Sequence, residues 1–249
     1  MTSKIMLITG AARGIGATTA RLAAQRGYAV CINYARAAKE ADALVSDIRK
    51  AEGRAIAVQA DIARDDDVKR LFETCDREFG KLDVLVNNAG IVGEPRRVDA
   101  MTREVLESVF ATNVFGPYYA AREAVKRMST QHGGHGGVIV NISSIAARHG
   151  GMAGETPYAA SKGALDTFTI GLAREVGREG IRVNAIRPGL ILTDMHEVHG
   201  GRAAVEKLTP TIPLGRAGNP EEIAETVLWL ASDAASYLHG ALIDVSGGR

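Results

Sequence analysis

Short runs of apolar residues recur along the chain, and each is followed by a longer stretch with helical spacing of apolar positions. The short runs predict buried strands, because a strand covered on both faces of a sheet reads as a continuous hydrophobic segment. The longer stretches predict amphipathic helices. The predicted strands are residues 4–9, 29–33, 55–59, 82–86, 138–142, 182–186 and 242–245, and the predicted helices are about 14–25, 39–52, 65–79, 102–128 and 157–177.

This alternation predicts an α/β fold with one parallel sheet, because parallel neighbours need a crossover and right-handed crossovers place helices on both faces. Another helix is expected after Asn219, which suits the N-cap, with Pro220 at the first helical position. The 249 residues show no internal repeat and no linker, so a single domain over residues 1–249 is the simplest interpretation. Residues 194–214 have the weakest pattern and are interpreted as a lid over a substrate.

Charge and composition exclude several classes of function. The formal net charge is +1, so no basic footprint indicates a nucleic-acid partner. No apolar run approaches the roughly 20 residues that span a bilayer, and the first residues lack a signal-peptide pattern. Cys31 and Cys75 are too few for a disulfide framework and are interpreted as reduced packing residues, which predicts a cytoplasmic protein.

A glycine-rich turn follows the first predicted strand and leads into the first helix. Gly10 permits a tight turn, while Gly14 and Gly16 allow the backbone to approach a pyrophosphate and the helix to pack closely on the strand. The helix N-terminus offers free N–H groups and a positive dipole end to phosphates. Strand, glycine turn and helix is the context that a dinucleotide-binding site requires, although a glycine turn without a ligand is the alternative.

Tyr158 and Lys162 are four residues apart in a predicted helix and therefore share one face. A free tyrosine has a pKa of about 10 and is a poor acid or base at neutral pH. A cation held beside it is expected to lower that pKa toward the working range. The pair alone is weak evidence, because such pairs are usually exposed.

Three further stretches, together with Tyr158 and Lys162, identify a resemblance. They are residues 9–16 (TGAARGIG), 87–90 (NNAG) and 141–144 (NISS), and their order resembles the short-chain dehydrogenase/reductase family from about Ile5 onward. The resemblance implies a Rossmann-type doubly wound parallel sheet of about seven strands. It also implies a reversible hydride transfer between a nicotinamide cofactor and a carbonyl or secondary alcohol.

The resemblance assigns four catalytic positions. Tyr158 is the acid or base, Lys162 lowers its pKa and holds the nicotinamide ribose, and Ser144 hydrogen-bonds the substrate oxygen. Asn113 interrupts its helix and binds a water that leads to the lysine. Ser143 is the fallback for Ser144, and the spacing from Ser144 to Tyr158 is one residue longer than is commonest in the family. This longer loop is expected to reshape the substrate side.

The resemblance also implies a set of cofactor contacts along the carboxyl edge of the sheet. Asp61 is expected at the adenine amino group, with a simple turn residue as the alternative, and Thr193 and the Ile191 backbone are expected at the nicotinamide carboxamide. The full set is Gly10, Arg13, Gly14, Ile15, Gly16, Asn33, Tyr34, Arg36, Asp61, Ile62, Asn88, Ala89, Gly90, Tyr158, Lys162, Pro188, Gly189, Ile191 and Thr193.

The end of the second strand predicts which cofactor is preferred. An NAD enzyme usually has Asp or Glu there to accept from the ribose 2′-hydroxyl, and residues 32–36 contain no carboxylate. Arg36 supplies a guanidinium suited to a 2′-phosphate, and Arg13 can approach the same group from the glycine loop. The sequence therefore predicts a preference for NADP(H), with NAD(H) still possible, against the alternative that both arginines are solvated surface charges.

The substrate stays open at this stage. A 3-oxoacyl-carrier-protein reductase and a glucose-type sugar 1-dehydrogenase are alternatives within the family, and a dinucleotide-sensing protein without turnover is an alternative from another class. Expected pocket residues are Ala146, Met152, Glu155, Leu190 and Met195.

The remaining expectations concern metals and assembly. The histidine pairs His132 and His135, and His196 and His199, lack flanking ligands and are interpreted as polar loops, so no metal site is predicted. The resemblance implies two isologous interfaces, one between the outer faces of the two long helices and one at the last helix and strand. A homotetramer is therefore expected.

Overall fold

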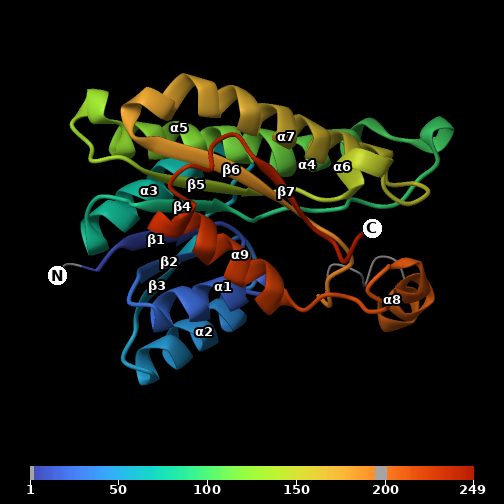
Figure 1. Ribbon diagram of the computed structural model, residues 1–249, viewed down its shortest axis with the longest axis horizontal. Coiled ribbons are helices and arrows are strands. Elements are labelled where there is room, and N and C mark those ends of the chain that lie inside the picture. The colour runs from blue at the N-terminus through green and yellow to red at the C-terminus, as the bar shows by residue number, and fades with distance from the viewer. Residues whose placement is uncertain (1–2, 194–200) are drawn as a thin grey trace.

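A computed structural model describes residues 3–193 and 201–249. Its centre is one seven-stranded, fully parallel sheet with the strand order β3-β2-β1-β4-β5-β6-β7 (Figure 1). The strands are β1 Ile5–Ile8, β2 Ala29–Tyr34, β3 Arg54–Gln59, β4 Val84–Asn87, β5 Gly137–Ile142, β6 Ile181–Pro188 and β7 Leu242–Val245. The order reverses between β1 and β4, which places the ligand-binding crevice of such a sheet at the carboxyl ends of these strands.

Helices cover both faces of the sheet. They are α1 Gly14–Gln25, α2 Ala38–Lys50, α3 Asp65–Phe79, α4 Arg103–Phe110, α5 Gly116–Met128, α6 Ala146–His149, α7 Thr156–Val176, α8 Gly201–Leu208 and α9 Pro220–Ala231. One hydrophobic core packs α1, α2 and α9 on one face of the sheet, and a second packs α3, α5 and α7 on the other (Figure 1). None of the described helices is long and apolar enough to cross a membrane.

The predicted α/β sheet is confirmed, and the predicted strand boundaries lie within two residues of the observed ones. The central strands β1, β2 and β4 could be located because they are buried on both faces and so read as mainly apolar runs. The helix predicted over residues 102–128 is divided: α4 and α5 are joined by a π-helical segment, Ala111–Phe115, which contains Asn113. The implied interruption at Asn113 is therefore present.

Two segments near the carboxyl edge differ from the sequence-based picture. The longer loop between Ser144 and Tyr158 contains the short helix α6, which the sequence did not reveal. In the predicted lid, α8 lies beside the carboxyl ends of the strands, and residues 194–200 lie outside the described part (Figure 1). At α9, the expected N-terminus is present, because the Glu222 carboxylate accepts from the Asn219 N–H at 2.8 Å.

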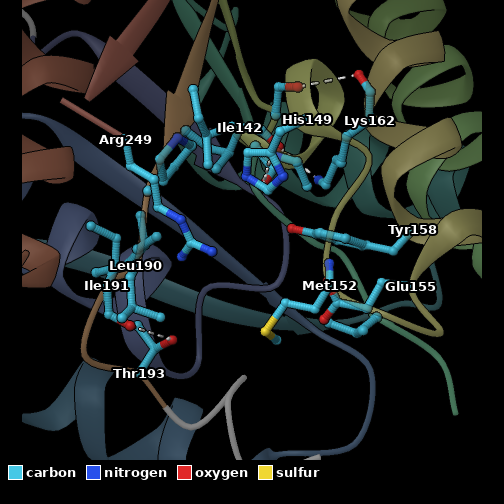
Figure 2. A pocket seen from close by; sticks show the side chains of 18 of the residues that line it. Ile142, His149, Met152, Glu155, Tyr158, Lys162, Leu190, Ile191, Thr193 and Arg249 are labelled. Atoms are coloured by element: carbon cyan, nitrogen blue, oxygen red, sulfur yellow. Dashed lines mark hydrogen bonds between the residues drawn. The ribbon is translucent and has the colours of Figure 1, made fainter. Parts of the chain in front are cut away.

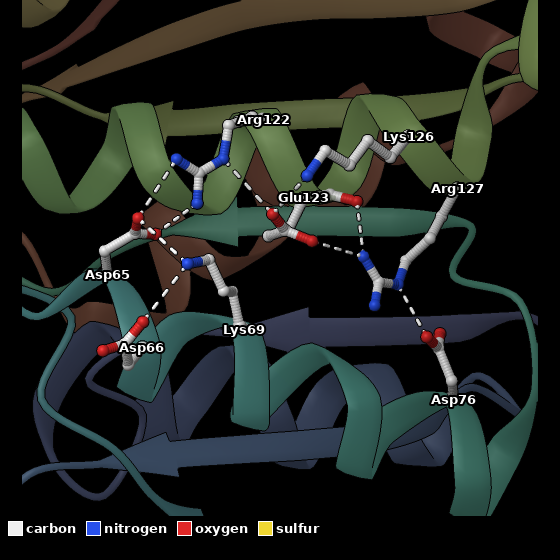
Figure 3. A network of polar contacts seen from close by, with 8 residues as sticks. All are labelled: Asp65, Asp66, Lys69, Asp76, Arg122, Glu123, Lys126 and Arg127. Atoms are coloured by element: carbon white, nitrogen blue, oxygen red, sulfur yellow. Dashed lines mark hydrogen bonds and ion pairs between the residues drawn. The ribbon is translucent and has the colours of Figure 1, made fainter.

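A polar network fixes α3 against α5, as Figure 3 shows; its members are Asp65, Asp66, Lys69, Asp76, Arg122, Glu123, Lys126 and Arg127. Glu123 is buried, and its carboxylate accepts from Lys126 and Arg127, each at 2.9 Å. Burial raises the pKa of Glu123, but these cations outweigh it and leave the pKa below its ordinary value. Arg127 also reaches Asp76 on α3 at 2.7 Å. The network therefore anchors the helix that continues from the Asn113 segment.

Candidate active site

Four elements bring their ends together at the carboxyl edge of the sheet. The end of β5 leads to Ser144, the first two turns of α7 carry Tyr158 and Lys162, and the π-helical segment carries Asn113. Ser144, Tyr158 and Lys162 line one cavity of about 120 Å³, shown from close by in Figure 2. The three predicted catalytic side chains that face a substrate are therefore together, as in an acid–base site.

The Tyr158 hydroxyl points into this cavity (Figure 2). The residue is buried, and burial raises the pKa of Tyr158 to about 12; a hydrogen bond with Ser144 lowers it and the Glu155 carboxylate raises it. Burial therefore dominates the pKa of Tyr158 here, and the Lys162 Nζ is 5.8 Å from the centre of the Tyr158 ring. The lowering of this pKa by Lys162 stays a prediction.

Lys162 is buried between β5 and α7, and its Nζ donates to the carbonyl oxygen of Ile142 at 2.8 Å. Burial lowers the pKa of Lys162 to about 8, and the nearby Asp166 carboxylate opposes this change. A Cβ built on Gly90 would lie 3.3 Å from this Nζ and 3.4 Å from the Asn113 Oδ1. The Lys162 ammonium and the Asn113 amide therefore both lie next to the backbone of Gly90, where a side chain would crowd them.

The two neighbouring serines have different surroundings. Ser143 is buried, and its hydroxyl donates to the Lys162 carbonyl oxygen at 3.2 Å, so it links β5 to α7. Both serines line the cavity, but Ser144 is only partly buried, and its hydroxyl accepts from the Ala146 N–H at 3.1 Å and hydrogen-bonds Tyr158. A substrate oxygen next to Tyr158 would meet Ser144, which favours Ser144 over Ser143 for the catalytic role.

Asn113 is fully buried and all of its amide is used. Its Nδ2 donates to the Ile91 carbonyl oxygen at 2.8 Å and to the Ser161 hydroxyl at 3.0 Å, while its Oδ1 accepts from the Ile91 N–H at 2.8 Å. These bonds fix the chain after Gly90 against α7. The water expected to lead from Asn113 to Lys162 stays a prediction.

The glycine loop between β1 and α1 has the shape that a pyrophosphate requires. Gly10 and Gly14 have φ values of +60° and +54°, in the left-handed region that favours glycine. A Cβ on Gly16 would lie 2.5 Å from the Asn88 Nδ2, so the loop packs directly on the segment after β4. The N-cap residue of α1, Arg13, makes no side-chain capping hydrogen bond, so the first N–H groups of the helix suit an anionic ligand. These residues fit a dinucleotide phosphate.

Other predicted cofactor residues have defined positions. Asn33 is buried: its Oδ1 accepts from the Gly10 N–H at 3.1 Å, and its Nδ2 donates to the Ala60 carbonyl oxygen at 2.9 Å. It therefore supports the glycine loop. Arg13 and Arg36 are exposed on the two segments that flank the end of β2. The Asp61 carboxylate accepts from the Ala63 N–H at 3.0 Å, so it serves at least as the turn residue considered above.

The segments after β4 and β6 complete the edge. The Asn88 Nδ2 donates to the carbonyl oxygens of Thr9 and Gly10 at 2.8 and 3.0 Å, which ties the two loops together. Five residues of the predicted cofactor set line the cavity with the catalytic groups on this side: Asn88, Pro188, Gly189, Ile191 and Thr193. The residues predicted to surround the nicotinamide thus line the same cavity as Tyr158.

The cavity wall agrees with part of the predicted pocket and adds to it. Ala146, Met152, Glu155 and Leu190 line the cavity, whereas Met195 lies outside the described residues. The sequence did not identify six further lining residues, Val92, Ile142, Ile145, His149, Leu208 and Arg249. The Gly247-Gly248 pair before Arg249 is a turn signal that could have drawn attention to that residue.

Comparisons with known proteins agree with this geometry. A family model described as enoyl-(acyl carrier protein) reductase matches residues 10–249. The uncharacterized oxidoreductase YgfF of Escherichia coli is 46% identical over 98% of this chain and 99% of its own, and a 3-oxoacyl-[acyl-carrier-protein] reductase of Synechocystis is 40% identical over 100% and 97%. A short chain dehydrogenase of Burkholderia cenocepacia, solved in complex with NADP, superposes with a TM-score of 0.91 at 33% identity over 99% and 98%.

Proposed function

The chain belongs to the short-chain dehydrogenase/reductase family, and we propose that it transfers hydride between NADP(H) and a small carbonyl compound or secondary alcohol. The observation that carries the proposal is the placement of Ser144, Tyr158 and Lys162 around one cavity beside the glycine loop. An oxidoreductase acting on CH–OH or C=O groups needs this combination: an acid, an oxygen-binding donor and a dinucleotide site.

Each of the four catalytic residues has a separate role in a carbonyl reduction. When bound, the dinucleotide supplies the hydride. Tyr158 donates its proton to the carbonyl oxygen, and the Ser144 hydroxyl donates a hydrogen bond to the same oxygen as charge develops there. The Lys162 ammonium stabilises the tyrosinate that remains, and Asn113 holds the backbone against which a proton-resupplying water would sit.

Preference for NADP(H) is supported by charge at the adenosine end. Arg13 and Arg36 flank the end of β2, and no carboxylate stands between Ile32 and Arg36 to repel a 2′-phosphate. The Burkholderia relative was solved with NADP. Asp61 and Ile62 are assigned to the adenine, and Gly14, Ile15 and Gly16 to the pyrophosphate. NAD(H) is the less preferred alternative to NADP(H).

Three further parts of the proposal concern the surroundings of the site. In the predicted lid, residues 194–214, the described part from residue 201 covers the substrate, which is supported by the position of α8 beside the carboxyl ends of the strands. The buried cysteines Cys31 and Cys75 are not disulfide-bonded, which supports a reducing, cytoplasmic compartment. The protein assembles as a homotetramer through apolar faces of its helices.

The test is Tyr158→Phe, which removes only the hydroxyl. We expect turnover of any accepted ketone to fall about 10²- to 10⁴-fold, because the hydroxyl assigned to protonate the carbonyl oxygen is lost, while NADPH binding stays near wild type. Steady-state kinetics and NADPH fluorescence titration measure the two effects. Tyr237→Phe, at a fully exposed tyrosine, is the matched control. Near-normal turnover in Tyr158→Phe would contradict the assignment, and absence of turnover in wild type over a broad carbonyl panel would favour a dinucleotide sensor.

A further inference from the structure

Two nitrogen-bearing side chains, His149 and Arg249, line the cavity beyond the catalytic residues. Figure 2 shows the Arg249 guanidinium extending into the cavity toward the Tyr158 hydroxyl, with the His149 ring above it. Across residues 3–193 and 201–249, no carboxylate lies within 4.0 Å of the Arg249 guanidinium or of the His149 ring. Their donors are therefore directed at the space that a substrate would occupy, and the described residues supply no counter-ion to them.

Arg249 is held there by a tight turn after β7. Gly247 and Gly248 have φ values of +67° and +92°, so the chain reverses through two left-handed residues. The Ser246 hydroxyl donates to the Arg249 carbonyl oxygen at 3.1 Å, and the Gly247 carbonyl oxygen accepts from the Leu214 N–H at 3.1 Å. These bonds fix the turn to the segment after α8 and so restrict the position of Arg249.

The position of His149 also depends on β7, the strand that precedes this turn. It is the last residue of α6, and the neighbouring Arg148 pairs with the Asp244 carboxylate of β7. Asp244 also contacts the Arg187 Nη1 at 3.5 Å, which links α6 to β6. The longer loop between Ser144 and Tyr158 therefore brings His149 to one wall of the cavity. The turn after β7 brings Arg249 to the same wall.

We propose that Arg249 and His149 form a binding site for a carboxylate of the substrate, so that the enzyme acts on oxo acids or the matching hydroxy acids. A guanidinium binds a carboxylate through two parallel hydrogen bonds, and an imidazole offers one N–H donor even when neutral. Val92, Met152, Leu190 and Leu208 supply apolar surface for a short carbon chain between the carboxylate and the reacting carbonyl. This inference rests on the proposed function and narrows its substrate class.

Glu155 is the carboxylate among the cavity-lining residues and has to be reconciled with an anionic ligand. It is only 6% exposed, and its Oε2 accepts from the Met152 N–H at 2.7 Å. The carboxylate is thus turned toward the backbone of its own loop. Lys162 and Arg249 outnumber it among the residues that line the cavity, so an anion can be accommodated at the Arg249 wall.

The experiment compares acids with their neutral esters in an NADPH-consumption assay. The probes are 3-oxobutanoate and 4-oxopentanoate with their methyl esters, and dihydroxyacetone phosphate with dihydroxyacetone. We expect wild type to have a kcat/KM at least ten-fold higher for an acid than for its ester. Arg249→Gln should lower the acid value ten-fold or more and the ester value less than three-fold, Arg249→Lys should retain part of the preference, and His149→Ala should show a smaller selective loss.

Arg178→Gln removes one exposed arginine far from the cavity and is the matched control for net charge. Equal kcat/KM for acid and ester in wild type, or equal losses for both in Arg249→Gln, would overturn the carboxylate site while leaving the oxidoreductase function intact. A preference for the phosphorylated ketone alone would overturn the choice of carboxylate. If no probe is turned over, calorimetry of 4-oxopentanoate with NADP⁺-loaded protein decides: binding lost in Arg249→Gln supports the site, and equal or absent binding overturns it.

Discussion

At the scale of single residues, the electrostatics of Tyr158 and Lys162 decide in which direction the site is prepared to work. Burial raises the pKa of the tyrosine to about 12 and lowers the pKa of the lysine to about 8. At neutral pH the tyrosine is therefore protonated, as carbonyl reduction requires, and the lysine is mostly charged. Alcohol oxidation instead needs the tyrosinate, which the raised pKa of Tyr158 disfavours at neutral pH.

This arrangement predicts a pH profile for reduction. The Lys162 ammonium is lost as pH rises through its pKa of about 8, while Tyr158 stays protonated up to about 12. We therefore expect kcat/KM, which reports the free enzyme, to be level below pH 8 and to fall about ten-fold per pH unit above it. Initial rates of ketone reduction between pH 6 and 10 measure this.

Asp166 provides a control for the source of the descending limb, because its carboxylate raises the pKa of Lys162 against the effect of burial. Asp166→Asn should move the limb to lower pH without removing the Tyr158 hydroxyl. The substitution also removes the carboxylate to which Arg187 donates at 2.8 Å. The positive charge of Arg187 is then less compensated, which lowers the pKa of Lys162 further. A profile that stays level to pH 10 in wild type would contradict the role given to Lys162.

At the scale of elements, the sequence predicts what depends on local pattern and misses what depends on distant contacts. The strands, the glycine loop and the first turn of α9 follow from apolar runs and capping residues in adjacent positions. The helix α6 spans only four residues and has no periodicity to detect, and its position depends on Arg148 meeting Asp244, 96 residues away. His149 and Arg249 were missed for the same reason, since only the folded chain brings them together.

The segments at the end of β2 and in the glycine loop carry the prediction on cofactor choice. Arg36→Ala and Arg13→Ala should each reduce the preference for NADP(H) over NAD(H), because a charge-assisted contact to a phosphate is worth about 1.5–3 kcal/mol, or roughly ten-fold or more. The wild type should prefer NADP(H) by at least about ten-fold. The measurement is kcat/KM for both cofactors in each protein.

Arg21→Ala is the matched control, because Arg21 is an exposed arginine on α1 one turn and more beyond the glycine loop. It should leave the ratio between the cofactors unchanged. Equal kcat/KM for NADP(H) and NAD(H) in wild type would refute the preference. Variants at Arg13 and Arg36 that keep the wild-type ratio would return both arginines to the status of solvated charges.

At the scale of the whole molecule, apolar side chains remain exposed on two separate faces. Leu106, Phe115 and Tyr118 lie along α4, the π-helical segment and α5, with Phe115 and Tyr118 each 50% exposed. Tyr118 also stacks on Phe168 of α7, with ring centres 3.8 Å apart, so this face joins the two long helical stretches. Trp229 on α9 is exposed on the other part of the surface. Exposed clusters of large apolar groups mark protein interfaces, which applies to the first face. Trp229 lies on the last helix, where the family resemblance implies the second interface.

These two faces lead to the prediction on assembly. Two independent isologous interfaces generate a tetramer with three two-fold axes, so light scattering should give four times the chain mass of 26.3 kDa. Placing charge on one face by Phe115→Glu with Tyr118→Glu should leave dimers held by the other face, because a carboxylate buried without a partner strongly disfavours association. Trp229→Glu should leave dimers held by the face that contains Phe115 and Tyr118. The variant that combines all three substitutions should be monomeric. Val98→Glu adds the same charge at another exposed apolar residue and should stay tetrameric. A wild-type mass of 26.3 kDa at micromolar concentration would exclude the assembly.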